Sequence, residues 1–324
     1  MITVVAPGGE FLTSWTTFKE WVSRLYVTRN FSYHSTDWNI GGSAHTHSAG
    51  LEPYCRRNRL SRKSVQFDIS SHMRLSFEKN TLTTRSQIWI SPITHQLQGT
   101  TKEGSAYHGY WQQDLYRLND AFGTEADLKA LVAGVHARNM SFMIDTIPNH
   151  MAWSGDASSV DYSKFNPINK QSQYHTFCDL NSEIATAGDN NATKILETCW
   201  LGDSTVELAD FRTEDPDVAN TLYDWIGQTV SNYSIDGLRI DAAKHIAPEF
   251  FPGFMKSAGV FGMGEVLDGN AAGACEWQKN SIGSVLNYPI YYPIRRAFGA
   301  TNGSMADIVE NLQAVNSDCQ VSHI

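Results

Sequence analysis

Hydrophobic and polar positions fall into a regular alternation of strand and helix patterns from about residue 86 onward. Short runs rich in β-branched and aromatic residues, such as "SQIWISP" (86–92), predict strands. The stretch "TEADLKALVAGVHARNM" begins with Thr124 and Asp127 at capping-box spacing and then places apolar residues on one helical face. Asp215 and Pro216 begin a second helix. We expect strands near residues 87–91, 141–145, 237–241, 259–265 and 284–288, and further helices near 248–258 and after a capping box at Ser304 and Asp307.

Strands that alternate with helices predict parallel βα units and an α/β fold. The segment 146–212 interrupts this order with little periodicity, two cysteines and many Asp and Asn residues. Residues 1–85 contain one possible helix, "WTTFKEWVSRLY", and then irregular polar sequence. We therefore expect residues 1–85 to be disordered or foreign to the fold.

Charge divides the 324-residue chain into two unlike parts. Residues 1–85 hold 11 Lys and Arg against 6 Asp and Glu, whereas residues 86–324 hold 14 against 28. The acidic part argues against nucleic acid as a partner and is compatible with an uncharged substrate such as a sugar. The basic run "RRNRLSRK" (56–63) could bind nucleic acid or act in targeting, but it has no aromatic platform and no helical period, which favours a solvated stretch.

Neither a membrane span nor a secretory signal is expected. No apolar run approaches the length that crosses a bilayer, and the first residues, "MITVVAPGGEFLT", have no basic region followed by a sustained apolar one.

The cysteines suggest an oxidising compartment. Cys178, Cys199, Cys275 and Cys319 admit three pairings, with Cys55 left over, and the sequential pairing would link two loop-rich regions. No close C-x-x-C pair is present, so zinc is not expected. Acceptor sequences for N-glycosylation occur at Asn30, Asn191, Asn232 and Asn302, which is compatible with secretion.

Acidic side chains lie at the ends of three predicted strands. In "GLRIDAAKHI" (237–246), Arg239 and Asp241 share one strand face while apolar residues occupy the other. Asp145 and Glu265 follow two other strands. Carboxylates at the C-terminal ends of successive parallel strands converge at one mouth of a (β/α) barrel, where enzymes of this fold place their active sites.

Three of these segments, "DTIPNH", "GLRIDAAKH" and "GEVLDG", resemble the first signature regions of the α-amylase family of glycoside hydrolases. "YHGYWQQDLY", "CWLGDSTVELAD" and "VLNYPIYYP" are similar to fungal secreted α-amylases in particular, and the resemblance covers about residues 86–324. It implies a partial (β/α)8 TIM barrel, incomplete at both ends. Residues 86–145 and 213–324 would form the barrel portions, and 146–212 an inserted calcium-binding subdomain.

The resemblance also implies the roles of individual residues. Asp241 would be the nucleophile of a retaining hydrolase and Glu265 the general acid/base, while Arg239 would keep Asp241 ionised. Asp145 would support the site without acting directly. Substrate contacts would come from His108, Tyr110, Trp111, His150, Arg239 and Lys244, with Tyr110 and Trp111 offering ring faces to sugars. Calcium would be held by Asn149, Glu197, Asp210 and His245, partly through backbone carbonyls.

The expected substrate is an α-1,4-glucan such as starch or glycogen, and the expected state is an extracellular monomer. The family's third acid, its last barrel strands and its C-terminal β-domain are not recognisable. We therefore expect the chain as written to be poorly active. The alternative is a non-catalytic glucan-binding fragment from an incomplete gene model.

Overall fold

The computed structural model describes residues 2–5, 87–181, 192–299 and 303–319. The chain divides into two compact units, of which Met1 with Ser14–Gln66 lies outside the described residues. The other unit, Ile2–Thr13 with Phe67–Ile324, contains all of the described residues. The possible helix near residue 20, the basic run at 56–63, Cys55, and the acceptor residues Asn30, Asn191 and Asn302 also lie outside the described residues.

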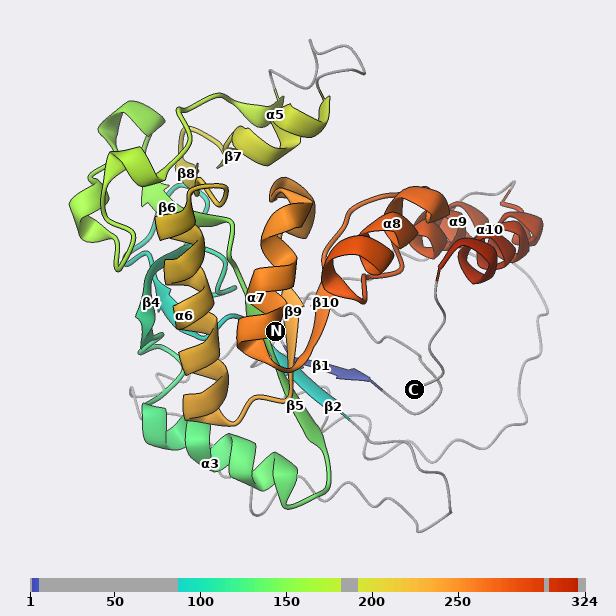
Figure 1. Ribbon diagram of the computed structural model, residues 1–324, viewed down its shortest axis with the longest axis horizontal. Coiled ribbons are helices and arrows are strands. Elements are labelled where there is room, and N and C mark those ends of the chain that lie inside the picture. Colours follow the sequence, from blue (N-terminus) through green and yellow to red (C-terminus); the bar gives the residue numbers. More distant parts are fainter. Residues whose placement is uncertain (1, 6–86, 182–191, 300–302, 320–324) are drawn as a thin grey trace, which may run out of the picture. The chain divides into compact units, whose positions relative to one another are not determined.

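A five-stranded sheet forms the centre of the unit, in the order β1-β2-β5-β9-β10 (Figure 1). Its strands are β1 (Ile2–Val5), β2 (Gln87–Ile90), β5 (Ser141–Thr146), β9 (Gly237–Ile240) and β10 (Phe261–Gly264). The last four run parallel to one another, as the alternating pattern predicts. Their C-terminal ends therefore meet at one edge of the sheet.

Two expectations about the strands are wrong. Residues 2–5 do join the fold, because β1 pairs with β2, although antiparallel and hence not as a βα unit. The strand expected at 284–288 is reduced to an isolated bridge between Val285 and Gly264. Helix α9 (Tyr288–Gly299) begins there instead, because the Asn287 side chain accepts a hydrogen bond from Ile290 N–H and prolines are tolerated in a first helical turn.

Helices α3 (Glu125–His136), α6 (Pro216–Tyr233) and α7 (Phe251–Ala258) pack near the parallel strands (Figure 1). The Thr124–Asp127 capping box of α3 is present, and Asp215 caps α6 ahead of its first proline. The main core lies among these elements and is built from fully buried side chains: Phe142, Ile144, Leu222, Trp225, Leu238, Ile240 and Phe254. It fixes the strands whose ends carry the acidic residues.

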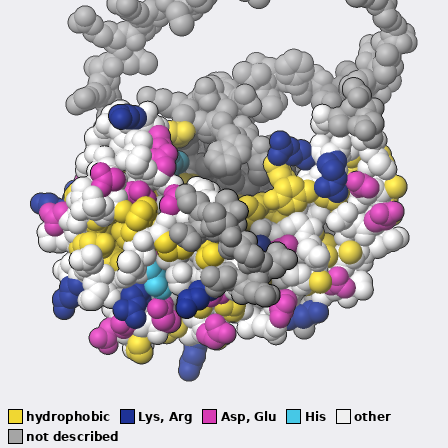
Figure 2. Space-filling model, turned by 90° about the horizontal axis from the view of Figure 1, so that it is seen from above, with side chains coloured by type: hydrophobic (Ala, Val, Ile, Leu, Met, Phe, Trp, Pro, Cys, Tyr) yellow, Lys and Arg dark blue, Asp and Glu magenta, His cyan; other side chains and the backbone are white. Residues whose placement is uncertain are grey.

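The C-terminal helices are α8 (Ala271–Trp277), the π-helix η7 (Gln278–Ile282), α9 and α10 (Met305–Asp318). Ser304 caps α10, but the expected capping box is wrong because the Asp307 carboxylate pairs with Arg296 of α9 instead. A disulfide between Cys275 and Cys319 joins α8 to the end of α10. Apolar side chains remain exposed on α9 and α10, among them Phe298, and Figure 2 shows apolar patches among charged side chains on one face of the molecule.

Segment 146–212 forms a small antiparallel sheet in the order β6-β8-β7, comprising β6 (His150–Ser154), β8 (Val206–Asp210) and β7 (Leu201–Gly202). It also holds the single-turn helices η1 (Ala157–Ser159), η2 (Tyr162–Lys164) and η3 (Gln171–Gln173), and α5 (Ala192–Thr198). Cys178 and Cys199 are disulfide-bonded, so the sequential pairing is confirmed for both bridges. A hairpin of β3 (Thr94–Gln96) and β4 (Gln112–Leu118) lies outside both sheets. None of the described helices is long and apolar enough to span a membrane.

Candidate active site

Three neighbouring parallel strands deliver the acidic side chains to one place. Asp145 lies on β5 and is paired in register with Arg239 of β9. Asp241 directly follows β9, and its N–H donates to the Thr146 carbonyl at 2.8 Å. Glu265 directly follows β10, and its N–H donates to Ile240 at 2.8 Å. The expected convergence at the strand ends is therefore present.

Arg239 is the centre of this cluster and is 6% exposed. Its Nη1 donates to both oxygens of Asp145, at 2.9 and 3.0 Å, and to Oδ1 of Asp241 at 2.6 Å. Its Nη2 lies 2.8 Å from Oε1 of Glu265. One buried cation thus holds three carboxyl groups, and it fixes Asp241 and Glu265 relative to one another through a single rigid guanidinium.

Opposing influences act on the pKa of Asp241. Burial raises the pKa of Asp241 to about 8, and the charges of Asp145 and Glu265 raise it too, while Arg239 opposes the shift. Burial likewise raises the pKa of Asp145. Arg239 thus favours the ionised form of Asp241, as expected from the sequence, but burial and the two neighbouring carboxyl groups act against it, and one positive charge is divided among three buried carboxyl groups.

The carboxyl group of Glu265 has further partners. The Tyr288 hydroxyl donates to Oε1 at 2.9 Å, and Ala242 N–H donates to Oε2 at 3.2 Å. Ala242 has a left-handed backbone conformation (φ 51°), which is uncommon for a residue other than glycine and turns the chain sharply after Asp241. The sequence analysis missed Tyr288, because it read that segment as a strand.

Aromatic residues border the cluster. The Tyr110 hydroxyl donates to Asp145 Oδ2 at 2.8 Å, and the rings of Tyr110 and Trp89 lie 5.9 and 5.8 Å from the Arg239 guanidinium carbon. Trp89 was missed, because strand β2 carries no motif. Trp111 is only 8% exposed and packs in a small core cluster, so the expectation that it offers an open ring face is wrong. The backbone N–H of Trp111 donates to the buried Gln96 side chain of β3, which holds Trp111 against the β3–β4 hairpin.

The two histidines expected at the site are held by hydrogen bonds. The Tyr110 N–H donates to His108 Nδ1 at 3.0 Å, and His150 Nε2 lies 3.2 Å from the Tyr110 carbonyl. Burial lowers the pKa of His108 and lowers that of His150 to about 4, so both imidazoles are neutral at pH 7. Lys244 Nζ reaches across to the loop after β10, where it donates to Leu267 O at 3.1 Å and lies 3.2 Å from Asp268 Oδ2.

The residues expected to bind calcium come from three segments. Asn149 precedes β6 and Asp210 ends β8, and the two strands pair His150 with Asp210. Oδ1 of Asn149 and Oδ1 of Asp210 are both buried without a hydrogen-bond partner in the described structure. Asp210 Oδ2 lies 2.7 Å from His175 Nδ1, and burial raises the pKa of Asp210 to about 7.

The remaining two, Glu197 and His245, lie close to each other in the fold. His245 Nδ1 is 3.1 Å from the carbonyl of Leu196, the neighbour of Glu197 on α5. Burial and the charge of Glu249 raise the pKa of the Glu197 carboxyl. In the described ranges no group of three or more His, Cys, Asp or Glu side chains could hold a metal ion. Two orphaned buried oxygens nevertheless suit a hard cation, provided that backbone carbonyls complete its ligand set.

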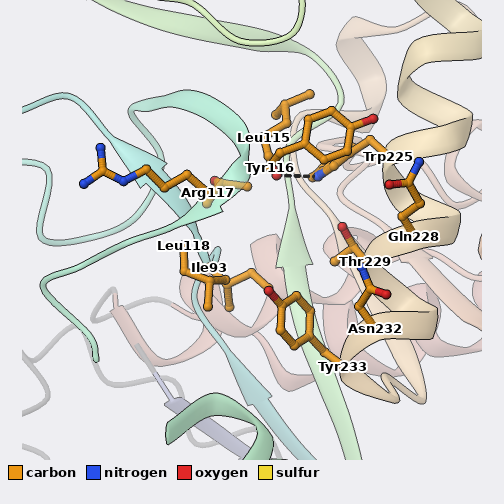
Figure 3. A pocket seen from close by; sticks show the side chains of 11 residues that line it. Ile93, Leu115, Tyr116, Arg117, Leu118, Trp225, Gln228, Thr229, Asn232 and Tyr233 are labelled. Atoms are coloured by element: carbon orange, nitrogen blue, oxygen red, sulfur yellow. Dashed lines mark hydrogen bonds between the residues drawn. The ribbon is translucent and has the colours of Figure 1, made fainter. Parts of the chain in front are cut away.

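Asn232 lies apart from these groups. It is exposed near the end of α6 and lines a shallow pocket between α6 and the β3–β4 hairpin (Figure 3). Trp225 lies at the same pocket and donates from Nε1 to Leu115 O at 2.8 Å. Apart from Asn232, none of the expected site residues lines this pocket.

Comparison with known proteins gives a consistent result. The family model "Alpha amylase, catalytic domain" matches residues 80–322. Alpha-amylase 2 of Schwanniomyces occidentalis is 47% identical over 233 residues, which are 72% of this chain and 44% of that protein. The alpha-amylase of Saccharomycopsis fibuligera is 43% identical over 72% of this chain and 45% of its own.

Solved structures agree. An alpha-amylase from Malbranchea cinnamomea superposes with a TM-score of 0.66 at 44% identity, covering 72% of this chain and 48% of the other. An alpha-amylase from Geobacillus thermoleovorans, solved in complex with acarbose, gives a TM-score of 0.60 at 25% identity over the same share of each chain. The chain thus spans about half the length of the relatives that it matches.

Proposed function

Because the chain belongs to the α-amylase family, we propose that it hydrolyses internal α-1,4-glucosidic bonds of starch or glycogen with retention of configuration. The observation that carries this proposal is the pairing of Asp241 and Glu265 on one guanidinium, that of Arg239. Retaining glycosidases need two carboxyl groups held about 5–5.5 Å apart. A shared buried cation on adjacent strands supports such a fixed spacing.

In the proposed reaction Asp241 attacks the anomeric carbon while Glu265 protonates the departing glucosyl oxygen. Glu265 then removes a proton from the water that hydrolyses the covalent intermediate. Asp241 has to be ionised to attack; burial and the charges of Asp145 and Glu265 raise its pKa, whereas Arg239 lowers it. When Glu265 carries the transferable proton, its negative charge no longer repels that of Asp241. Arg239 then neutralises one carboxylate fewer, so the pKa of Asp241 falls.

Substrate would be held by groups that border the cluster. We propose that His108, Tyr110, His150 and Lys244 contact the sugar, with the neutral imidazoles hydrogen-bonding to hydroxyl groups. Asp145, which is bound to Arg239 and Tyr110, orients the guanidinium. Trp111 is omitted from this set because it is buried.

The donor set fits calcium. Asn149 and Asp210 would supply their orphaned Oδ1 atoms, while Glu197 and His245 would supply backbone carbonyls. A bound ion would join the inserted sheet to the loop after β9, which carries Asp241. The family relationship supports such a site, and a cation that binds only the native state would stabilise the fold.

Membership of the α-amylase family also suggests the domain organisation and the cellular location. We propose that residues 86–145 and 213–324 belong to the family's (β/α)8 barrel and that 146–212 is its inserted subdomain. The two disulfides and the exposed acceptor Asn232 support a secreted glycoprotein, which we propose to be a monomer.

The test replaces each proposed catalytic carboxyl by its amide in the full-length protein, as Asp241→Asn and Glu265→Gln. Each variant is expected to lose starch hydrolysis by several powers of ten, measured as new reducing ends. Exposed Glu276→Gln is the matched control and should keep wild-type activity. NMR of the first products should show the α-anomer. Glucan binding without hydrolysis by the wild type would contradict the proposal and would favour a non-catalytic binding protein.

A further inference from the structure

We propose that Tyr288 is a positioning residue that orients the carboxyl group of Glu265 so that its transferable proton is carried on Oε2. This inference rests on the proposed function of Glu265 as general acid/base. Its starting observation is the hydrogen bond of 2.9 Å from the Tyr288 hydroxyl to Oε1 of Glu265.

The backbone holds Tyr288 in place at the end of β10. Gly264 N–H donates to Ser284 O at 2.9 Å, and Leu286 N–H donates back to Gly264 O at 3.0 Å. Tyr288 N–H then donates to Leu286 O at 2.8 Å as α9 begins. The segment before α9 is thus fastened to the residue that precedes Glu265, so the tyrosine and the carboxyl group are positioned by the same short stretch of sheet.

The two oxygens of Glu265 have different surroundings. Oε1 faces two donors, the Tyr288 hydroxyl and Arg239 Nη2, at 2.9 and 2.8 Å. Among the described residues, the one hydrogen bond to Oε2 comes from Ala242 N–H, at 3.2 Å. A proton on Oε1 would be repelled by the Arg239 cation and by the hydroxyl hydrogen of Tyr288, whereas Oε2 has a lone pair available for the proton. The proton therefore belongs on Oε2, and the two donors to Oε1 fix the rotation of the carboxyl plane.

Tyr288 suits this task better than a second cation would. Burial raises the pKa of Tyr288, and so does the nearby charge of Glu265, so its hydroxyl remains a donor at every working pH. Arg239, by contrast, also holds Asp145 and Asp241, whereas the Tyr288 hydroxyl donates to Glu265. A neutral donor orients Glu265 without adding another charge to the cluster.

The experiment compares Tyr288→Phe with wild type on two substrates in the full-length protein. In maltoheptaose the leaving group is the 4-hydroxyl of a glucose unit, which needs the proton of Glu265, whereas α-maltotriosyl fluoride releases fluoride and needs that proton far less. Loss of a hydrogen bond to a charged group predicts a fall in kcat/KM on maltoheptaose of about tenfold or more. The fall on the fluoride should be less than about threefold. Tyr291→Phe, on the same helix and half-exposed, is the matched control and should match wild type on both.

Glu265→Gln separates the inference from the proposed function. It should abolish maltoheptaose hydrolysis but keep the first, burst release of fluoride, because that step needs little help from a proton, whereas hydrolysis of the covalent intermediate still needs Glu265 as base. Adding Tyr288→Phe to it should not lower the burst rate much further. Wild-type hydrolysis of maltoheptaose by Glu265→Gln would overturn the proposed function and this inference with it. Equal losses on the two substrates in Tyr288→Phe, or no loss on either, would overturn the inference alone.

Discussion

Glu207 carries a buried charge that the fold tolerates at a cost, and removing that charge should stabilise the protein. It is the second residue of β8, the central strand of its sheet, opposite Trp153 of β6 and Gly202 of β7, and is 5% exposed. Burial raises the pKa of Glu207 to about 7, with further contributions from the charges of Asp179 and Asp203. We predict that Glu207→Gln, which keeps the shape of the side chain, raises the free energy of unfolding at pH 8.

The sign and size of the effect follow from proton linkage. Below pH 4.5, the ordinary value for this carboxyl, folded and unfolded chains both bind the proton and the charge costs nothing. Between 4.5 and about 7 only the folded chain keeps it, so the stability of wild type falls as pH rises and then levels off. The whole difference corresponds to roughly 3 kcal/mol. Relaxation and solvent screening around the charge reduce this difference, so we expect about 1–2 kcal/mol at pH 8.

The assay is urea unfolding of wild type and Glu207→Gln at pH 4 and pH 8, with constant calcium. The variant should be more stable at pH 8 and equal to wild type at pH 4. Glu276→Gln, an exposed position on α8, should show no difference at either pH. An equal gain for Glu207→Gln at both pH values would refute the electrostatic reasoning, because a packing effect does not follow the titration of the carboxyl.

Three further outcomes are expected. Chelation of calcium should lower the melting temperature, and Asp210→Ala should mimic it; an unchanged curve in excess chelator would speak against the site. Replacing both Cys178 and Cys199 by Ala should cost about 2–4 kcal/mol in urea unfolding, since the bridge closes a loop with a sequence separation of 21, whereas a loss below about 0.5 kcal/mol would contradict this. Gly253→Ala should cost about 1–3 kcal/mol, because its Cβ would lie 2.6 Å from the Tyr223 ring; wild-type stability would show that the ring moves freely.

Local patterns were sufficient to predict the elements that depend on neighbouring residues. The capping box at Thr124 and Asp127 and the proline start of α6 are interactions within one helical turn, and both form as predicted. The same pattern at Ser304 and Asp307 gives no capping box, because Asp307 pairs with Arg296 of another helix. The location of the strand ends could also be predicted, because parallel strands place their C-terminal residues at one edge of the sheet whatever the detailed packing. For that reason the convergence of Asp145, Asp241 and Glu265 could be predicted before the structure.

The packing around those residues could not be predicted in the same way. Whether Trp111 shows its ring or buries it depends on Ala152 and Val206, which lie far along the chain. The sequence "VLNYP" is compatible with a strand or with the start of a helix. The backbone hydrogen bonds between Gly264 and the segment before α9 bring the Tyr288 hydroxyl to the Glu265 carboxyl group.

The protonation of the clustered carboxyl groups depends on the tertiary structure more than any other feature of the site. From the sequence, Arg239 and Asp241 are a pair on one strand face, which favours an ionised aspartate. In the fold the same guanidinium also holds Asp145 and Glu265, and burial removes the water that would otherwise stabilise three negative charges. A pKa depends on every charge within a few ångströms and on the surrounding solvent, and both are set by strands that are distant in sequence and adjacent only once the sheet has formed.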